Sequence, residues 1–185
     1  MISLSRNTGS PPGSLLHIIE QEHGAEMCLC NALEQLADAL PEPLDPEIAS
    51  AGITTLRSCV RRHIVLEECY LYPTLLKRAK KDEFKEDLLA HISREHASDE
   101  SHAHEAADEM EEALLLGQVP KPEMLGYMLR GFFEARRRHI AWENAVIIPL
   151  ARQRLSKSDF TPFPVTLFEE SLGSELSSFL SAGKR

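Results

Sequence analysis

The most constraining feature of the sequence is a block that occurs twice. Residues 61–73 read RRHIVLEECYLYP and residues 137–149 read RRHIAWENAVIIP. In both copies an arginine pair precedes a histidine, a glutamate follows four residues later, and a proline follows after ten. A weaker echo precedes each copy, with EHGAE at 22–26 and EHASDE at 95–100. The chain therefore reads as a doubled helical hairpin, with one histidine on the first helix of each half and a His-x-x-x-Glu pair on the second.

The rest of the pattern predicts four helices. Apolar residues recur at helical spacing between sparse proline and glycine breaks, and no alternating strand pattern is present. Asp45 and Pro46 are typical of a helix start, Gly117 is typical of a helix end, and Gly52 is a candidate interruption. The expected helices span residues 15–40, 46–79, 83–116 and 122–155. Their short connections predict an all-α, antiparallel, up-down-up-down four-helix bundle.

Three regions of the chain are expected to differ in organisation. Residues 1–13 lack the apolar core of a signal peptide and are predicted to be a disordered lead-in. Residues 14–155 form the predicted bundle. Residues 156–185 contain a proline-bearing linker and a short amphipathic helix at about 165–180. That segment is free to dock on the bundle, to meet a protein partner or to self-associate, and the sequence leaves these choices open.

Composition excludes some classes of partner. The net charge of −9 argues against a nucleic-acid partner, which requires a basic surface. No stretch reaches the roughly 18 apolar residues that a membrane helix needs. The four cysteines are spaced neither as a CxxC metal clip nor as a secreted disulfide framework: Cys28, Cys30, Cys59 and Cys69. Reduced, packed thiols in a cytoplasmic protein are the main interpretation, with redox sensing as the alternative.

The spacing within each block has a direct structural consequence. Four residues along an α-helix advance about 6 Å and turn by about 40°, so His63 and Glu67 project from one face, as do His139 and Glu143. Both faces are otherwise apolar. A buried carboxylate without a partner costs several kcal/mol or takes up a proton. The two pairs could satisfy each other across the bundle, and a bound metal would satisfy them better.

The donor count indicates a pair of metal ions. Four imidazoles and two bridging carboxylates would come from six side chains: His23, His63, Glu67, His96, His139 and Glu143. This set offers about four donors to each of two ions, so a six-coordinate ion keeps about two positions for solvent and an exogenous ligand. Imidazole with carboxylate suits iron, with manganese or zinc less favoured. The absence of thiolate spacing argues against structural zinc.

These residues together resemble the hemerythrin HHE cation-binding domain. The resemblance rests on His23, on HIVLE at 63–67, on His96, on HIAWE at 139–143 and on the proline after each paired histidine. It covers about residues 14–155. It implies a four-helix bundle with two iron ions joined by an oxo or hydroxo bridge, and one open position for O2, peroxide or nitric oxide.

Three functions are compatible with that resemblance. The first is a di-iron protein that binds, senses or handles a small oxidant, as in oxygen sensing or a stress response. The second is catalytic: a peroxidase-like scavenger, or an iron donor in iron–sulfur cluster repair. The third is an interaction module whose metal only stabilises the bundle. The sequence does not establish whether the chain is an enzyme.

One position departs from the pattern of O2-carrying hemerythrins. Those proteins have a second histidine one turn beyond the third-helix histidine, where this chain has Glu100. The substitution makes the expected site richer in oxygen ligands, which should favour ferric iron and weaken reversible O2 binding. The sequence leaves Glu100 open between a metal ligand, a residue that supports a ligand, and solvated surface.

Other residues near the repeats have less specific expectations. Tyr70 lies one turn after Glu67, so its hydroxyl could bond a bridging carboxylate, although an edge-of-core aromatic is the preferred interpretation. Trp142 is expected to shield the site from water. Four arginines before the paired histidines are expected to face solvent and pair with surface acids: Arg61, Arg62, Arg137 and Arg138.

Overall fold

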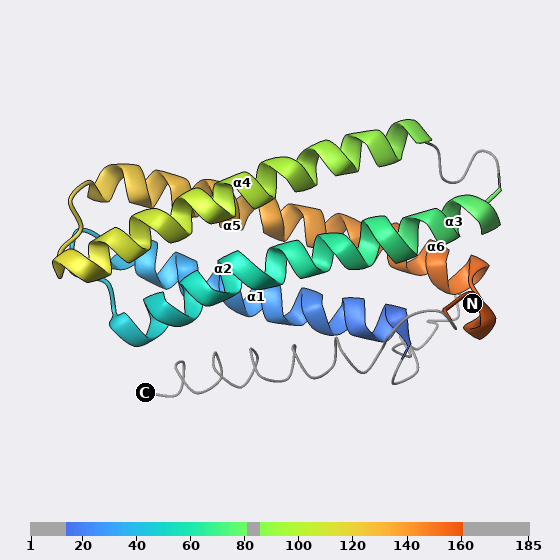
Figure 1. Ribbon diagram of the computed structural model, residues 1–185, viewed down its shortest axis with the longest axis horizontal. Coiled ribbons are helices and arrows are strands. Elements are labelled where there is room, and N and C mark those ends of the chain that lie inside the picture. Colours follow the sequence, from blue (N-terminus) through green and yellow to red (C-terminus); the bar gives the residue numbers. More distant parts are fainter. Residues whose placement is uncertain (1–13, 81–85, 161–185) are drawn as a thin grey trace, which may run out of the picture.

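Four long antiparallel rods make up the computed structural model, which describes residues 14–80 and 86–160 (Figure 1). Three of the rods begin as α1 (Leu15–Ala39), α2 (Pro46–Leu66) and α5 (Pro122–Ala145), and the remaining rod is α4 (Glu86–Leu116). Two rods are extended by further segments: η1 (Glu67–Leu71) and α3 (Tyr72–Arg78) after α2, and α6 (Ile147–Arg154) and η2 (Lys157–Phe160) after α5. The described residues contain no strand, and the predicted all-α bundle is confirmed.

Local signals in the sequence account for several helix ends. The Asp45 side chain accepts hydrogen bonds from the backbone N–H groups of Glu47 and Ile48, and Pro46 occupies the first turn of α2. Gly117 has a φ of 64° immediately after α4, a conformation that glycine adopts without steric cost. The starts and ends predicted at these positions are therefore found in the structure.

The second rod is interrupted at a different place from the one considered in the sequence. Gly52 lies within continuous α2, where a Cβ atom would approach Met110 Cε to 3.3 Å, so the glycine serves close packing of α2 against α4. The interruption is η1, a π-helical turn in which the Tyr72 N–H bonds to the Glu67 carbonyl. Because this turn contains an extra residue, Glu67 and Tyr72 can face the same centre although they are five residues apart.

Two apolar clusters occupy the bundle core. One contains Leu29, Leu33 and Phe132, and the other contains Ile18 and Ile148, each with further buried neighbours. Between them along the rods lies a layer of buried polar side chains: Glu22, His23, Glu26, His63, Glu67, His96, Asp99, Arg136, His139 and Glu143. A polar layer inside a core requires internal partners, because most of its atoms are shielded from water.

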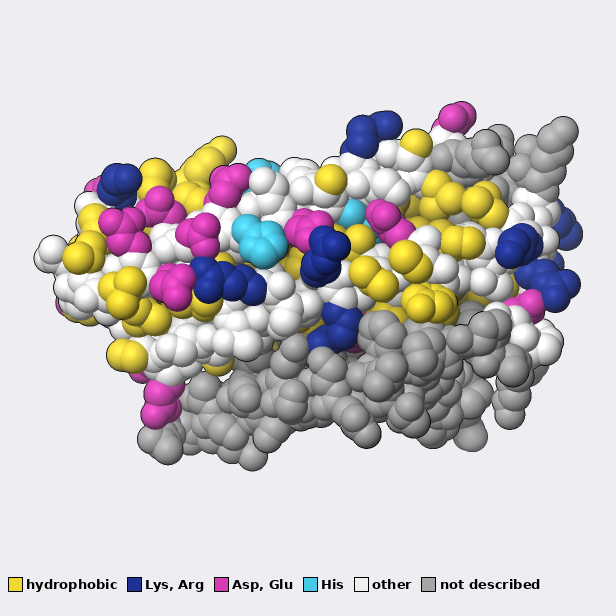
Figure 2. All heavy atoms as spheres, viewed as in Figure 1, with side chains coloured by type: hydrophobic (Ala, Val, Ile, Leu, Met, Phe, Trp, Pro, Cys, Tyr) yellow, Lys and Arg dark blue, Asp and Glu magenta, His cyan; other side chains and the backbone are white. Residues whose placement is uncertain are grey.

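The outer surface carries charges of both signs, which are spread over the left half and the middle of the face drawn in Figure 2 and appear again at its right end. Arg57, for example, pairs with Asp108 at 2.6 Å and with Glu111 at 2.7 Å. Among the described helices none has the length and apolar character needed to cross a membrane. The predicted lead-in at 1–13 and the predicted helix at 165–180 lie outside the described residues.

Candidate metal centre

The structure brings the six predicted ligand side chains to one buried centre. They form two overlapping groups, one of His23, His63, Glu67 and Glu143 and the other of Glu67, His96, His139 and Glu143. Within each group the candidate ligand atoms all lie within 4.8 Å of one another. Both glutamates belong to both groups, so they lie where two neighbouring cations would share ligands.

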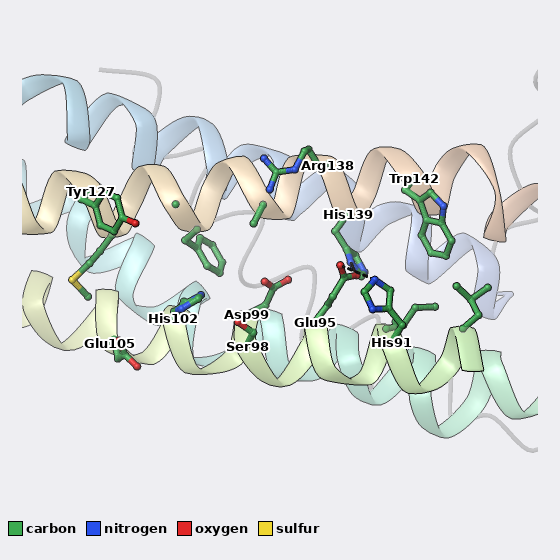
Figure 3. A pocket seen from close by; sticks show the side chains of 16 residues that line it. His91, Glu95, Ser98, Asp99, His102, Glu105, Tyr127, Arg138, His139 and Trp142 are labelled. Atoms are coloured by element: carbon green, nitrogen blue, oxygen red, sulfur yellow. Dashed lines mark ion pairs between the residues drawn. The ribbon is translucent and has the colours of Figure 1, made fainter. Parts of the chain in front are cut away.

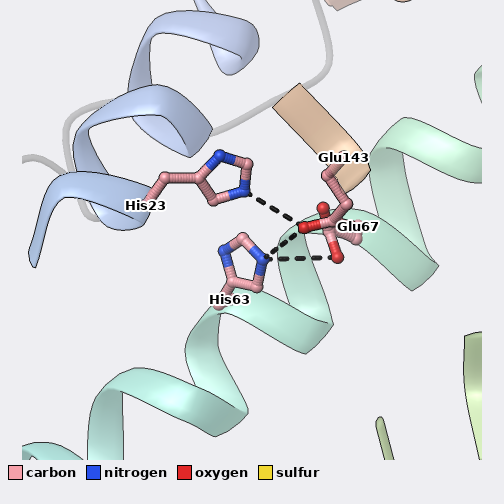
Figure 4. Close-up of side chains that lie close together, drawn as sticks. All are labelled: His23, His63, Glu67 and Glu143. Atoms are coloured by element: carbon pink, nitrogen blue, oxygen red, sulfur yellow. Dashed lines mark ion pairs between the residues drawn. The ribbon is translucent and has the colours of Figure 1, made fainter. Parts of the chain in front are cut away.

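The first group joins three rods around Glu143 (Figure 4). His23 Nε2 lies 3.2 Å from Glu143 Oε2, and His63 Nε2 lies 3.7 Å from the same oxygen. His63 Nε2 also lies 3.3 Å from Glu67 Oε2. The two imidazole rings have centroids 5.0 Å apart and are tilted by 53°. These residues therefore point their Nε2 atoms and carboxylates at a common point.

The second group repeats this geometry on the other side of the two glutamates. His96 Nε2 lies 3.4 Å from Glu67 Oε2, and His139 Nε2 lies 3.3 Å from Glu143 Oε1. The two Nε2 atoms are 3.3 Å apart. Their ring centroids are also 5.0 Å apart with a tilt of 53°. The sequence repeat is therefore expressed as an approximate twofold symmetry of the centre.

Buried polar atoms without partners indicate that this centre fits a cation. Four atoms of the first group have no hydrogen-bond partner among the described residues: His23 Nε2, His63 Nε2, Glu67 Oε1 and Glu143 Oε2. Such atoms are rare in protein interiors, because each loses its hydration without compensation. Imidazole nitrogens and carboxylate oxygens are ligands that transition-metal ions accept. A cation bound here would remove the deficit.

The other ring nitrogen of each of the four candidate histidines lies near an oxygen outside the centre, within hydrogen-bond distance and geometry for His23 and His96 only. Asn144 Oδ1 lies 2.9 Å from His23 Nδ1, and Glu68 Oε1 lies 2.8 Å from His96 Nδ1. Glu22 Oε2 lies 3.3 Å from His63 Nδ1, and Glu95 Oε2 lies 3.7 Å from His139 Nδ1. An acceptor at Nδ1 favours a proton there and leaves the Nε2 lone pair directed inward.

These four acceptors were not predicted, although the repeat contains their signal. Glu22 and Glu95 immediately precede the single histidines of the two halves. Glu68 and Asn144 immediately follow the paired glutamates. Aligning the two halves beyond the ligands would have identified them as corresponding pairs.

Tyr72 makes the hydrogen bond that was considered for Tyr70. Its hydroxyl lies 2.9 Å from Glu67 Oε2 and 2.7 Å from Glu143 Oε1, and the side chain is buried. Its ring stacks on His96 with centroids 6.3 Å apart. Tyr70 is half-buried beside the apolar cluster. The π-helical turn changes the register, which spacing counted along an ideal α-helix does not foresee.

Glu100 belongs to neither group of candidate ligands. Its Oε1 atom lies 2.5 Å from Arg61 Nη1, in an ion pair on the outer face of the bundle. Arg137 pairs with Glu34 at 2.6 Å, in line with the expected surface role. Arg62 differs from the expectation, because its side chain is only 11% exposed and its Nε donates to Glu22 Oε1 at 2.5 Å. Arg62 therefore pairs with the carboxylate that lies 3.3 Å from His63 Nδ1.

A buried arginine next to the centre was also not predicted. Arg136 is fully buried, and its Nε donates to Glu26 Oε2 at 2.6 Å. Its Nη1 lies 3.6 Å from Asp99 Oδ2. Burial alone would lower the pKa of Arg136, but the negative charge and hydrogen bond of Glu26 raise it, so the guanidinium stays charged. The repeat gave no signal for Arg136, since the first copy has Val60 at the corresponding position.

Electrostatics couples the ligands to one another. Burial by itself lowers the pKa of His63, but the charges of Glu67 and Glu26 outweigh it and raise that pKa well above its usual value. Burial raises the pKa of Glu143, yet its contacts with His139, His23 and His63 hold it well below its usual value. Without metal the neighbouring carboxylates therefore favour a proton on His63, and a cation bound there would displace that proton.

A groove between α4 and α5, with a volume of about 780 Å³, reaches the centre from one side (Figure 3). His139 lines the groove, together with Glu95, Asp99 and Arg138. Trp142 also lines it and is half-buried, so it borders this opening instead of covering the centre completely. The groove gives the second group of ligands an approach from solvent.

None of the four cysteines, all of which lie within the described residues, forms a disulfide bond. Cys30 and Cys59 are buried and Cys28 is half-buried, as expected of small packed residues, whereas Cys69 is exposed. Burial raises the pKa of the Cys30 thiol to about 12, so this group remains a protonated core residue at neutral pH.

A four-helix bundle with buried histidines and carboxylates on facing helices defines a class of metal-binding proteins. The chain belongs to the hemerythrin HHE cation-binding domain family, whose model matches residues 14–151. Comparison with curated proteins and with solved structures found no match. The family and the buried His/Glu groups together support a cation site at this centre.

Proposed function

We propose that this chain is a non-haem di-iron protein that binds and handles a small oxidant, namely O2, peroxide or nitric oxide. The observation that carries the proposal is the sharing of Glu67 and Glu143 by two histidine-bearing groups, because shared carboxylates bridge paired metals. Mixed imidazole and carboxylate ligation suits iron better than manganese or zinc.

The side chains have separate roles in this proposal. His23 and His63 would hold one ion and His96 and His139 the other, with the two glutamates between them. Bound iron would supply one-electron redox chemistry and affinity for the oxidant. Tyr72 contacts both glutamates and holds a proton beside them, and the apolar clusters on either side exclude water.

The groove supplies a path for the small ligand. Among the six ligand residues, His139 lines the groove, whereas His63 on the opposite side is completely buried. A molecule as small as O2, nitric oxide or hydrogen peroxide would therefore approach the centre along α4 and α5, next to His139. The half with His23 and His63 is better suited to keep its ion than to exchange ligands.

Iron uptake under anaerobic conditions tests the proposal. Metal-free protein is incubated with ferrous salt, and bound iron is counted after desalting. We expect two iron ions per chain, and a near-ultraviolet absorption after oxidation. Addition of O2, peroxide and nitric oxide in separate samples should change the spectrum with at least one of them. Uptake of no more than trace iron would remove the proposal.

An iron donor for iron–sulfur cluster repair is a second candidate. The groove beside the centre is lined by several side chains that cations favour: His91, Glu95, Asp99, His102 and Glu105. Such a lining would suit an ion that leaves as well as an oxidant that enters. Transfer of bound iron to a damaged cluster protein, at a rate above release to buffer, would favour this candidate. Peroxide turnover with a reductant would favour an enzyme instead.

Two further expectations belong to this proposal. Four thiols that form no disulfide bond support a cytoplasmic location, where thiols stay reduced. Residues 156–185 are proposed as the contact for another chain, since they extend past the matched family region. The third alternative is an interaction module whose metal only stabilises the bundle. Such a module would unfold when its metal is removed and would not respond to oxidant, so folding retained in the metal-free protein would count against it.

A further inference from the structure

A buried arginine lies one helical turn from the candidate metal centre. Arg136 is 0% exposed and precedes His139 by three residues on α5. Its Nε donates to Glu26, but its Nη1 and Nη2 have no hydrogen-bond partner within the described part of the chain. The guanidinium thus keeps several N–H donors unused in a place that excludes water.

The arginine belongs to the layer of side chains next to the ligands. Glu26 follows His23 by three residues on α1, and Asp99 follows His96 by three residues on α4. Since α1 and α4 run opposite to α5, all three charged residues lie on the same side of the centre. The α2 rod contributes buried Val60 to this layer, at the position that the repeat aligns with Arg136.

Stability alone does not explain a charge at this position. Replacing a buried ion pair by packed apolar residues of similar volume is often neutral or stabilising. The other half of the chain has valine at the equivalent position in the same layer. A charge inside a bundle acts over several ångströms with little screening by salt, because the surroundings have a low dielectric constant.

We propose that the buried pair of Arg136 and Glu26 sets the reduction potential of the iron centre, an inference that rests on the proposed function. Oxidation removes one electron from an iron ion and adds one positive charge to the centre. The guanidinium opposes that added charge, and Glu26 partly offsets the guanidinium. Arg136 contacts none of the six ligands in this role; it acts through the field that it creates.

Redox titration of the iron-loaded full chain tests the inference. Arg136→Met should lower the midpoint, so that the ratio of reduced to oxidised iron at the wild-type midpoint falls about tenfold, or about 59 mV for a one-electron step. Arg136→Lys should retain most of the wild-type midpoint. Glu26→Gln should shift the midpoint in the opposite direction, because it removes the compensating negative charge.

Arg137→Met is the matched control, because it removes a positive charge from the next residue of the same helix. Arg137 pairs with Glu34 at the surface, so its shift should be smaller and should vanish at high salt. The Arg136→Met shift should persist at high salt.

Iron content separates failure of this inference from failure of the proposed function. Wild-type protein without iron would overturn both. Variants that carry wild-type iron and show the wild-type midpoint would overturn this inference alone. Should Arg136→Met fail to fold, Glu26→Gln decides the question, and an unchanged midpoint in that variant rejects the inference.

Discussion

The two halves of the centre have the same ligands in different surroundings. In each half an imidazole pair has ring centroids 5.0 Å apart with a 53° tilt, and each pair faces the same two carboxylates. Their outer partners differ, since His23 is held by the amide of Asn144 and His96 by the carboxylate of Glu68. The repeat preserved what a cation needs, while the residues around it diverged.

The divergence extends to residues that touch or border the centre. Tyr72 hydrogen-bonds to the carboxylates, and its counterpart in the second copy is buried Ile148. Glu22, behind His63, is completely buried, whereas the side chain of Glu95, behind His139, is 50% exposed. We infer that the His23 half is built to retain an ion, and the His139 half to admit ligands.

Glu143→Gln should have the largest effect, because this carboxylate serves both halves at once. We expect loss of both ions, with binding weakened by more than about 100-fold, the upper end of what loss of a merely supporting residue costs. A chelator competition assay measures the change. Glu134→Gln, at an exposed position of α5, is the control. A variant that keeps one tightly bound ion would mean that the halves do not share this ligand.

Tyr72→Phe should destabilise the metal-free protein, because its hydroxyl is a buried donor to charged groups. Hydrogen bonds to charged groups contribute about 1.5–3 kcal/mol, and the free energy of unfolding in urea should fall by that amount. Tyr127→Phe, at a position that is 81% exposed, should be neutral. If Tyr72→Phe were as stable as Tyr127→Phe, the Tyr72 hydroxyl would not stabilise the first half of the centre.

Changing either outer acceptor to the chemical type of the other should make the halves more alike. Glu68→Gln should weaken binding of one ion about tenfold, because a carboxylate at Nδ1 makes the imidazole of His96 a stronger donor. Asn144→Asp should strengthen binding in the half of His23 by a similar factor. Stepwise metal titration by calorimetry resolves the two ions. If each substitution changed the affinity for both ions equally, the two halves would not bind their ions independently.

Narrowing the groove should slow ligand entry without affecting iron content. Ala135 is half-buried, lines the groove and lies one turn before His139, so Ala135→Leu would place a larger side chain there. The rate of nitric oxide binding, followed by stopped-flow spectroscopy, should fall by about tenfold. Ala141→Leu adds the same bulk at an exposed position and should leave the rate unchanged. An unaltered rate in Ala135→Leu would require another route.

Glu100→Ala should have the smallest effect. The carboxylate pairs with Arg61 on the surface and lies outside both groups of ligands, so iron content and the spectrum of the loaded protein should match the wild type. A lost ion or a shifted absorption in this variant would mean that Glu100 binds or supports the metal. The ligands of the two halves would then differ more than the structure indicates.

Much of the architecture could be predicted from spacing, because a helix converts sequence separation into direction. His63 with Glu67 and His139 with Glu143 were assigned to common faces in this way, and the start of α2 at Asp45 followed from local chemistry. The contact of Tyr72 with the centre could not be predicted by counting along an ideal α-helix, because one extra residue in the turn Glu67–Leu71 changes the register. Arg136 lacked an equivalent in the repeat, so the pattern did not single it out.

The sequence by itself determined the four-helix class and the six side chains that meet at the centre, since these depend on periodicity and duplication, and the resemblance of its motifs indicated the family. The tertiary structure decided which side of the centre opens to solvent, between α4 and α5. It also decided which buried charges surround the ligands. Both depend on how complete rods pack against one another, and that packing is a sum of contacts between residues far apart in the chain.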